Sequence, residues 1–68
     1  METRDIKEIK AFVERKMGKF DSVEVIEDNG KTVWLTVNDE EDEIENGSII
    51  INRRNGYDGE YRVISYNI

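Results

Sequence analysis

Cysteine and histidine are both absent from this chain of 68 residues, and each absence excludes a class of structure or chemistry. Without cysteine there can be neither a disulfide framework nor a thiolate metal site. Without histidine there is no Ser-His or Cys-His nucleophilic system, no common zinc site and no side chain that ordinarily titrates near neutral pH. Carboxylates, Lys, Arg and Tyr remain for chemistry, so we expect no catalytic activity, no metal and no cofactor.

Long apolar runs are also missing. No unbroken run exceeds three residues, as at Val33–Leu35 and Ile49–Ile51, and the N-terminus is charged from its second residue. This pattern predicts neither a secretory signal nor a membrane span, and hence a cytoplasmic protein that does not bind membranes. Frequent Ile, Lys, Glu and Asn without any proline is typical of AT-rich coding sequences, such as those of low-GC bacteria and their phages.

The length predicts one domain over residues 1–68 with a small core. A chain of this size buries only about 60% of the surface that its unfolded form exposes, which leaves little room for an internal active site. The formal charge of −6 is concentrated in residues 22–47, which hold nine acidic side chains and one basic one. This excess of negative charge argues against direct binding of nucleic acid.

The N-terminal segment has the periodicity of an amphipathic helix over about residues 5–17. Its apolar residues recur at steps of three and four, with Phe12 at the edge of the stripe. The stripe consists of Ile6, Ile9, Val13 and Met17. Asp5 and Glu8 have the spacing of a capping box, and Gly18 is suited to a left-handed C-terminal cap.

The segment Lys31–Asn38 alternates as a strand does, with Val33, Leu35 and Val37 on one side. An earlier strand over 22–27 precedes it, joined by the turn sequence Asp28-Asn29-Gly30. A two-residue loop would place Glu24 opposite Leu35. A three-residue loop places Val25 opposite Val33 and keeps one face apolar, so we expect a type I turn with a bulge and a left-handed Gly30.

Two further strands are predicted, over 49–54 and 60–67, and the second again alternates. The expected fold class is α+β, with one N-terminal helix packed on a four-stranded antiparallel meander in the order α-β-β-β-β. The helix can cover only one sheet face, with Ile9, Val13, Val25, Leu35 and Ile51 in the core.

An acidic run separates the second and third expected strands. It consists of Asp39, Glu40, Glu41, Asp42, Glu43 and Glu45. A calcium loop of the EF-hand type starting at Asp42 would place Gly47 correctly, but Ile44 and Arg53 would occupy ligand positions. We therefore expect a solvated acidic loop. Weak binding of a divalent ion and a negative surface for a basic partner are the alternatives.

Two other patterns could carry chemistry. The carboxylate pairs Glu24 with Glu27 and Asp58 with Glu60 would need a desolvated cleft to act as general acids or bases. In the C-terminal third, arginines alternate with tyrosines, a combination that can bind single-stranded nucleic acid or form cross-strand pairs such as Arg54 with Glu60. These residues are Arg53, Arg54, Tyr57, Tyr61, Arg62 and Tyr66. The net charge favours the cross-strand pairs.

The face that the helix leaves uncovered is the most informative feature. Alternation places several large apolar residues there, together with an arginine, and this mixture is typical of protein interfaces. The expected contact residues are Ile26, Trp34, Ile50, Arg62, Ile64 and Tyr66, with Ile68 as a further candidate. Coverage of this face by a chain end or by the acidic loop is the alternative.

These observations predict a small, acidic, non-catalytic module that binds another protein, or a second copy of itself, through the uncovered sheet face. Two alternatives remain open. One is an acidic inhibitor that mimics nucleic acid and blocks a basic nucleic-acid-binding protein. The other is a homo-oligomeric structural protein.

Overall fold

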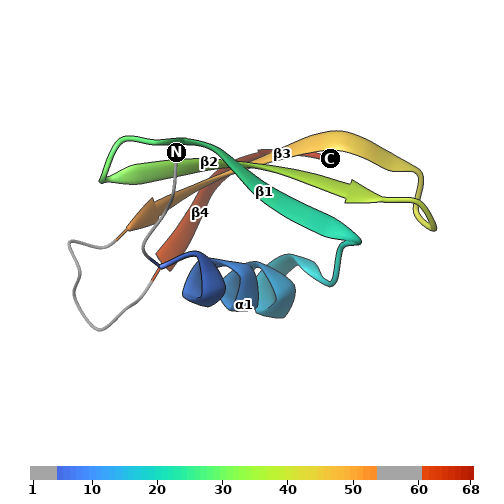
Figure 1. Cartoon of the computed structure of the whole chain (residues 1–68), viewed down its shortest axis with the longest axis horizontal. Coiled ribbons are helices and arrows are strands. Elements are labelled where there is room, and N and C mark those ends of the chain that lie inside the picture. The colour runs from blue at the N-terminus through green and yellow to red at the C-terminus, as the bar shows by residue number, and fades with distance from the viewer. Residues whose placement is uncertain (1–4, 54–60) are drawn as a thin grey trace.

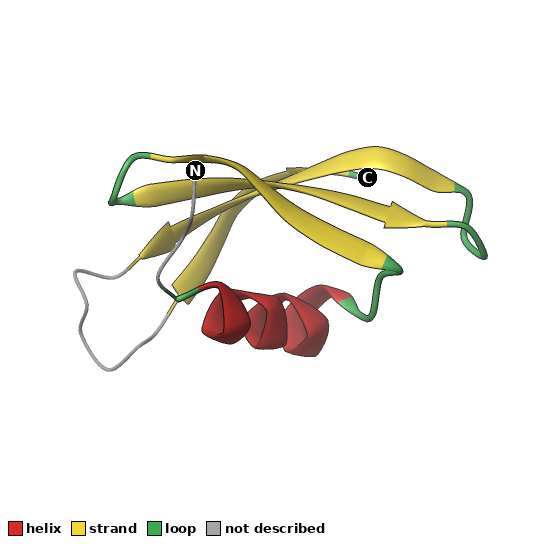
Figure 2. Ribbon diagram, viewed as in Figure 1, coloured by secondary structure: helices red, strands yellow, loops and turns green. Residues whose placement is uncertain are grey.

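A computed structural model describes residues 5–53 and 61–68. It contains one helix, α1 (Ile6–Met17), and four strands, β1 (Ser22–Asp28), β2 (Thr32–Asp39), β3 (Ile44–Arg53) and β4 (Tyr61–Asn67). The strands form one antiparallel sheet in the order β1-β2-β3-β4, and α1 lies across one side of it (Figures 1 and 2). The predicted α+β meander is confirmed.

The core lies between α1 and the sheet face that it covers, here called the inner face. The helix buries Ile9, Phe12 and Val13 because these residues share one side of its surface. The sheet contributes Val33, Leu35, Val37, Ile49 and Ile51, all fully buried. Val25, expected in the core, is partly buried and packs against it.

The helix begins and ends where the sequence indicated, but the side chain at its N-terminal cap is used differently. Gly18 has a φ of 104°, and its N–H donates to the carbonyl oxygen of Glu14 at 3.2 Å. The predicted capping box is wrong, because the side chain of Asp5 makes no capping hydrogen bond to the helix backbone. The carboxylates of Asp5 and Glu8 instead accept hydrogen bonds from the hydroxyl of Tyr61 in β4.

The register of β1 on β2 also differs from the prediction. Val25 lies opposite Leu35, and Val23 lies opposite Val37, two residues further along β2 than expected. A bulge at Ile26 lies within β1, where the register shifts between Val25 and Glu27. The same face stays apolar in both registers because side chains alternate with a period of two. Gly30 has the predicted positive φ, at 93°.

The connection between β2 and β3 is a tight hairpin rather than a long acidic loop. β3 begins at Ile44, five positions before the predicted start, and Asp39 pairs with Ile44 across the hairpin. Only residues 40–43 form the turn. Glu43 and Asn46 have positive φ values of 56° and 54°, which the backbone needs at the turn and at the adjoining bulge.

Candidate functional site

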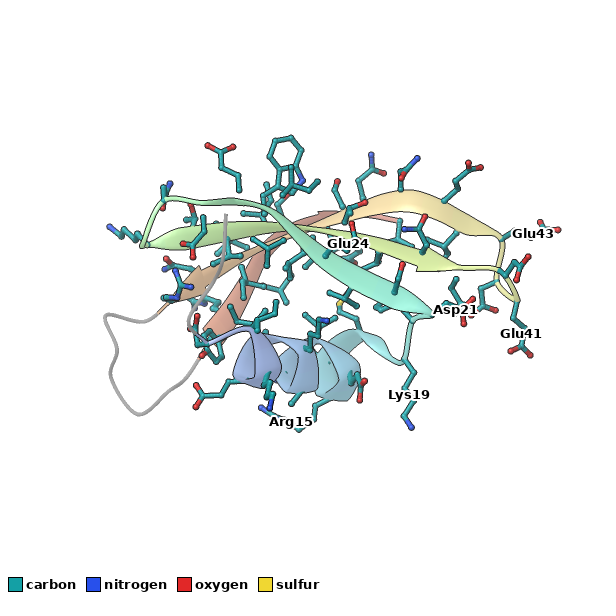
Figure 3. All side chains as sticks on the ribbon, viewed as in Figure 1. Arg15, Lys19, Asp21, Glu24, Glu41 and Glu43 are labelled. Carbon is teal, nitrogen blue, oxygen red and sulfur yellow. The ribbon has the colours of Figure 1, made fainter. Side chains whose placement is uncertain are left out.

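The sheet face opposite α1 is here called the outer face, and no helix of the described residues lies over it (Figure 2). Glu24 points away from the sheet on this side (Figure 3). Trp34 lies at its centre, paired directly with Ile50 on β3 and with Glu27 on β1. Trp34 is 41% exposed although it lies in an interior strand. Ile50 is half-buried beside it.

Two further isoleucines, each the extra residue of a bulge, lie beside this central row. In β1 the extra residue is Ile26, and in β4 the register shifts between the partners of Ile50 and Ile51, so that Ile64 is the extra residue. Ile26 and Ile64 are 52% and 51% exposed. Together with Trp34 and Ile50 they form an apolar belt across all four strands. We use the term apolar belt for these four residues.

Polar side chains border the belt, and their charges differ between the two edges. Glu24 and Glu27 project from β1, whereas Arg62 projects from β4 and pairs in register with Asn52. All three charged residues are exposed. Uncharged residues occupy the central strands between them, where Thr36 pairs with Ser48 and Thr32 pairs with Asn52. The outer face is therefore acidic along one edge and basic along the other.

Tyr66 does not belong to this face, and its predicted placement is wrong. The bulge at Ile64 reverses the alternation, so Tyr66 lies opposite Ile49, a fully buried residue of the inner face. Its side chain borders a groove with Lys16 and Met17 at the end of α1, and it remains 64% exposed. Ile68 is likewise on the inner face, near Gly47 and Val37. Of the other predicted contact residues, Trp34, Ile50 and Arg62 lie on the outer face, and Ile26 and Ile64 occupy the bulges of its two edge strands.

Beneath the belt, Arg53 connects three segments of the chain. Its side chain is almost fully buried, and all five of its N–H donors form hydrogen bonds. The guanidinium contacts the carboxylates of Asp5 and Asp28, each through two hydrogen bonds of 2.6 and 2.9 Å. It also donates to the carbonyl oxygen of Gly30 at 3.2 Å. We call Asp5, Asp28, Arg53 and Tyr61 the Arg53 cluster.

The bulge at Ile26 explains how Asp28 reaches Arg53. Simple alternation from Val25 would turn Asp28 toward the outer face. The extra residue reverses the alternation, and Asp28 pairs with the fully buried Val33 on the inner face. The bulge therefore directs the Asp28 carboxylate into the Arg53 cluster.

The contacts within the Arg53 cluster shift the pKa values of its members. The hydrogen bonds from Arg53 lower the pKa of Asp5 below its usual value of 3.8, against the opposing effect of burial. The two carboxylates raise the pKa of Arg53 further above its already high value. Burial, together with hydrogen bonds to Asp5 and Glu8, raises the pKa of Tyr61. The cluster therefore holds fixed charges, and its chemistry is that of a structural ion pair.

The acidic run occupies the end of the β2–β3 hairpin, where Glu41 and Glu43 point outward (Figure 3). Asp39 is an exception, because it is 8% exposed and accepts a hydrogen bond from the N–H of Glu41. Asp21 accepts from the N–H of Glu40 at 2.8 Å and so links this turn to the start of β1. Within residues 5–53 and 61–68, no group of three acidic side chains is arranged to hold a metal ion.

Several residues considered in the sequence lie outside the described part. Arg54, Tyr57, Asp58 and Glu60 are among residues 54–60, so the pair Arg54 with Glu60 and the carboxylate pair Asp58 with Glu60 cannot be placed. The other carboxylate pair, Glu24 with Glu27, is exposed on the outer face of β1.

Comparisons with protein-family models, with curated proteins and with solved structures each gave no match to this chain. In the part of the chain that the structure describes, α1 is too short and too polar to cross a membrane.

Proposed function

We propose that this protein is a non-catalytic binding module that contacts another protein chain through its outer face. The observation that carries the proposal is the apolar belt, in which Ile26, Trp34 and Ile64 remain about half exposed on a face that no element of the described chain covers. Large apolar side chains gathered on one face, with a polar border, are the usual composition of a protein interface.

Preorganisation also supports this proposal. Trp34 and Ile50 lie in the two interior strands and therefore have fixed backbones on both sides. The Arg53 cluster holds β3 against the ends of α1 and β1 on the inner face. Rigid aromatic anchors lose little conformational entropy on binding, which is the property that concentrates binding energy in such residues.

The acidic hairpin supports the alternative of a nucleic-acid mimic less well. Imitation of a phosphate backbone requires negative charges spaced along an extended surface. Here the exposed carboxylates of residues 40–43 are gathered within one turn at the end of the hairpin. The outer face itself carries charges of both signs.

Site-specific photocrosslinking in the source cell tests the proposal. A photoreactive residue replacing Thr36, which borders the belt, should form an adduct with another chain. The same residue replacing Ala11, on the exposed side of α1, should form none. Adding Trp34→Ala to the Thr36 variant should abolish the adduct. Equal crosslinking from both positions, or an adduct that persists without Trp34, would contradict a binding role for the outer face.

A further inference from the structure

The charged edges of the outer face indicate what kind of partner it fits. We propose that the partner is a second copy of this chain, packed face to face about a twofold axis parallel to the strands. This inference rests on the proposed function, since it uses the same outer face. In this dimer β1 of one copy lies over β4 of the other.

Charge selects this arrangement over its main alternative. A twofold axis parallel to the strands places Glu27 on β1 near Arg62 on β4 of the second copy, and it forms this contact twice. An axis perpendicular to the strands places β1 over β1 and β4 over β4, so that the edge strand with Glu24 and Glu27 meets its own copy and the edge strand with Arg62 meets its own copy. Opposed like charges disfavour an interface, whereas complementary ones fix its orientation.

Both charged residues are available for such contacts. Within residues 5–53 and 61–68, neither Glu27 nor Arg62 has a side-chain hydrogen bond or an ion pair, and both are exposed. They project from opposite edge strands, which lie about 14 Å apart across a four-stranded sheet. This separation is too large for Glu27 and Arg62 to contact each other within one copy. In the proposed dimer, Glu27 of one copy instead lies near Arg62 of the other.

The same axis matches the apolar residues. It places β2 over β3 of the second copy, so that Trp34 meets Ile50, its neighbour in the central row. It also places Ile26 of β1 over Ile64 of β4, and these bulge residues flank the central row on opposite edges. The apolar belt is therefore complementary to itself under the axis that the charges select.

The acidic hairpin does not prevent this association. Face-to-face sheets are separated by about 10 Å, which already exceeds the Debye length of about 8 Å at physiological salt. In addition, the end of the β2–β3 hairpin bends toward the side of α1, away from the outer face (Figure 1). The like charges of the two hairpins therefore lie behind the interface and weaken it chiefly at low salt.

The size of the face sets the strength of the dimer. Four strands, with about six paired positions each, cover roughly 400 Å² per copy. The dimer would then bury about 800 Å² in total, less than the roughly 1,200–2,000 Å² of stable complexes. We therefore expect a reversible dimer with a Kd between about 10 µM and 1 mM.

Sedimentation equilibrium between about 10 µM and 2 mM tests the inference. Trp34→Ala should weaken dimerisation about thirtyfold or more. Glu27→Arg and Arg62→Glu should each weaken it about tenfold, because each creates two like-charge contacts. The double variant Glu27→Arg/Arg62→Glu should recover the wild-type Kd. An equimolar mixture of the two single variants should also dimerise, as a heterodimer.

Matched controls separate local contacts from total charge. Glu14→Arg and Lys10→Glu change the net charge by the same amounts on the exposed side of α1, and both should keep the wild-type Kd once salt is physiological. Circular dichroism confirms that each variant is folded. A monomer at every concentration, or a dimer insensitive to Trp34→Ala, would overturn the inference.

Single charge reversals that leave the Kd unchanged would overturn the strand-parallel axis, because a perpendicular axis keeps like charges opposed in the wild type and in each variant. Failure here is distinguishable from failure of the proposed function. A monomeric protein that still crosslinks from position 36 to a different chain, in a manner dependent on Trp34, retains a binding outer face and loses only the second copy as its partner.

Discussion

Arg53 and Asp5, 48 residues apart in the sequence, are joined by two hydrogen bonds, from Nε to Oδ2 at 2.9 Å and from Nη2 to Oδ1 at 2.6 Å. The contact fixes the start of α1 to the end of β3. Because the same guanidinium also binds Asp28, three separate segments meet at one side chain. Such a bidentate arrangement is specific to arginine, whose planar donors match carboxylate oxygens.

Replacing Arg53 should destabilise the fold strongly. Arg53→Ala removes the guanidinium that contacts the mostly buried carboxylates of Asp5 and Asp28, and removal of one partner from such a pair costs about 3–5 kcal/mol. The total stability of a domain of this size is only about 5 kcal/mol. Urea denaturation should show a partly or fully unfolded variant. Arg62→Ala, on the outer face, serves as the control and should change the free energy of unfolding by no more than about 0.5 kcal/mol. Equal effects of the two substitutions would argue against a structural role for the cluster.

Acid should weaken the fold through Asp5. The pKa of this carboxyl is lower in the folded state than its usual value of 3.8. The ionised form therefore contributes stability that is complete above about pH 5 and is lost as pH falls through the folded-state pKa. The free energy of unfolding, measured in urea from pH 7 to pH 2, should decrease below about pH 4. Asp5→Asn should be less stable at pH 7 and should show a shallower decrease. A variant with the full wild-type acid dependence would mean that other carboxylates are responsible.

Alkali should act through Tyr61. The pKa of its hydroxyl is raised above the usual value of 10.0, so the neutral form contributes stability that is complete below about pH 10 and is lost as pH rises further. Thermal melts between pH 8 and pH 12 should show this loss. Tyr61→Phe removes the hydrogen bonds to Asp5 and Glu8 and should cost about 1–3 kcal/mol at pH 7. The stability of Tyr61→Phe should then change less above pH 10 than the stability of Tyr66→Phe. The second variant is the control, because it leaves the Arg53 cluster intact.

The negative charges of the turn at residues 40–43 should be dispensable for folding. Changing its four carboxylates to amides removes repulsion between charges that lie within a Debye length of about 8 Å, so stability should stay constant or rise slightly. Any gain should disappear in about 1 M NaCl, as measured by thermal denaturation. Asp39 is kept, because it is buried and accepts a backbone hydrogen bond. A saturable shift of the turn resonances at micromolar calcium would show that this segment is a cation site.

Periodicity was sufficient to predict the helix, the presence of the four strands and most of the predicted core, although Val25 is only partly buried and β3 begins earlier than expected. Burial on one side imposes a period of 3.6 on α1 and of two on β2, and both periods are present in the sequence. The partners of Val25 could not be predicted in this way. A shift of two residues leaves every side chain on the same face, so the apolar pattern does not distinguish the two registers. Local hydrogen bonds favour the observed loop: Asp28 accepts from the N–H of Gly30, and Asn29 accepts from those of Lys31 and Thr32.

Simple alternation correctly predicted which residues lie on the outer face only as far as the bulge in each edge strand. Trp34, Ile50 and Arg62 follow simple alternation and lie where the sequence placed them. Tyr66 comes after the bulge at Ile64, and no turn residue or glycine in the sequence marks that bulge. The Arg53 cluster did have a signal, since Arg53 follows Ile49 and Ile51 at steps of two and therefore points inward. The capping-box pattern obscured it, because Asp5 fits either role and its side chain can serve only one.

The bulges at Ile26 and Ile64 also affect how the protein behaves when it is concentrated. They interrupt β1 and β4, the two edge strands of the sheet that the described residues form. A bulge twists the edge and breaks the regular ladder that an added strand must match, so growth by edge-to-edge pairing is discouraged on both sides. A chain that lacks proline, one of the residues that block such growth, thus has another means to avoid fibre formation. Deleting Ile26 or Ile64 would restore a regular edge, and we expect the shortened variant to aggregate at concentrations at which the wild type does not.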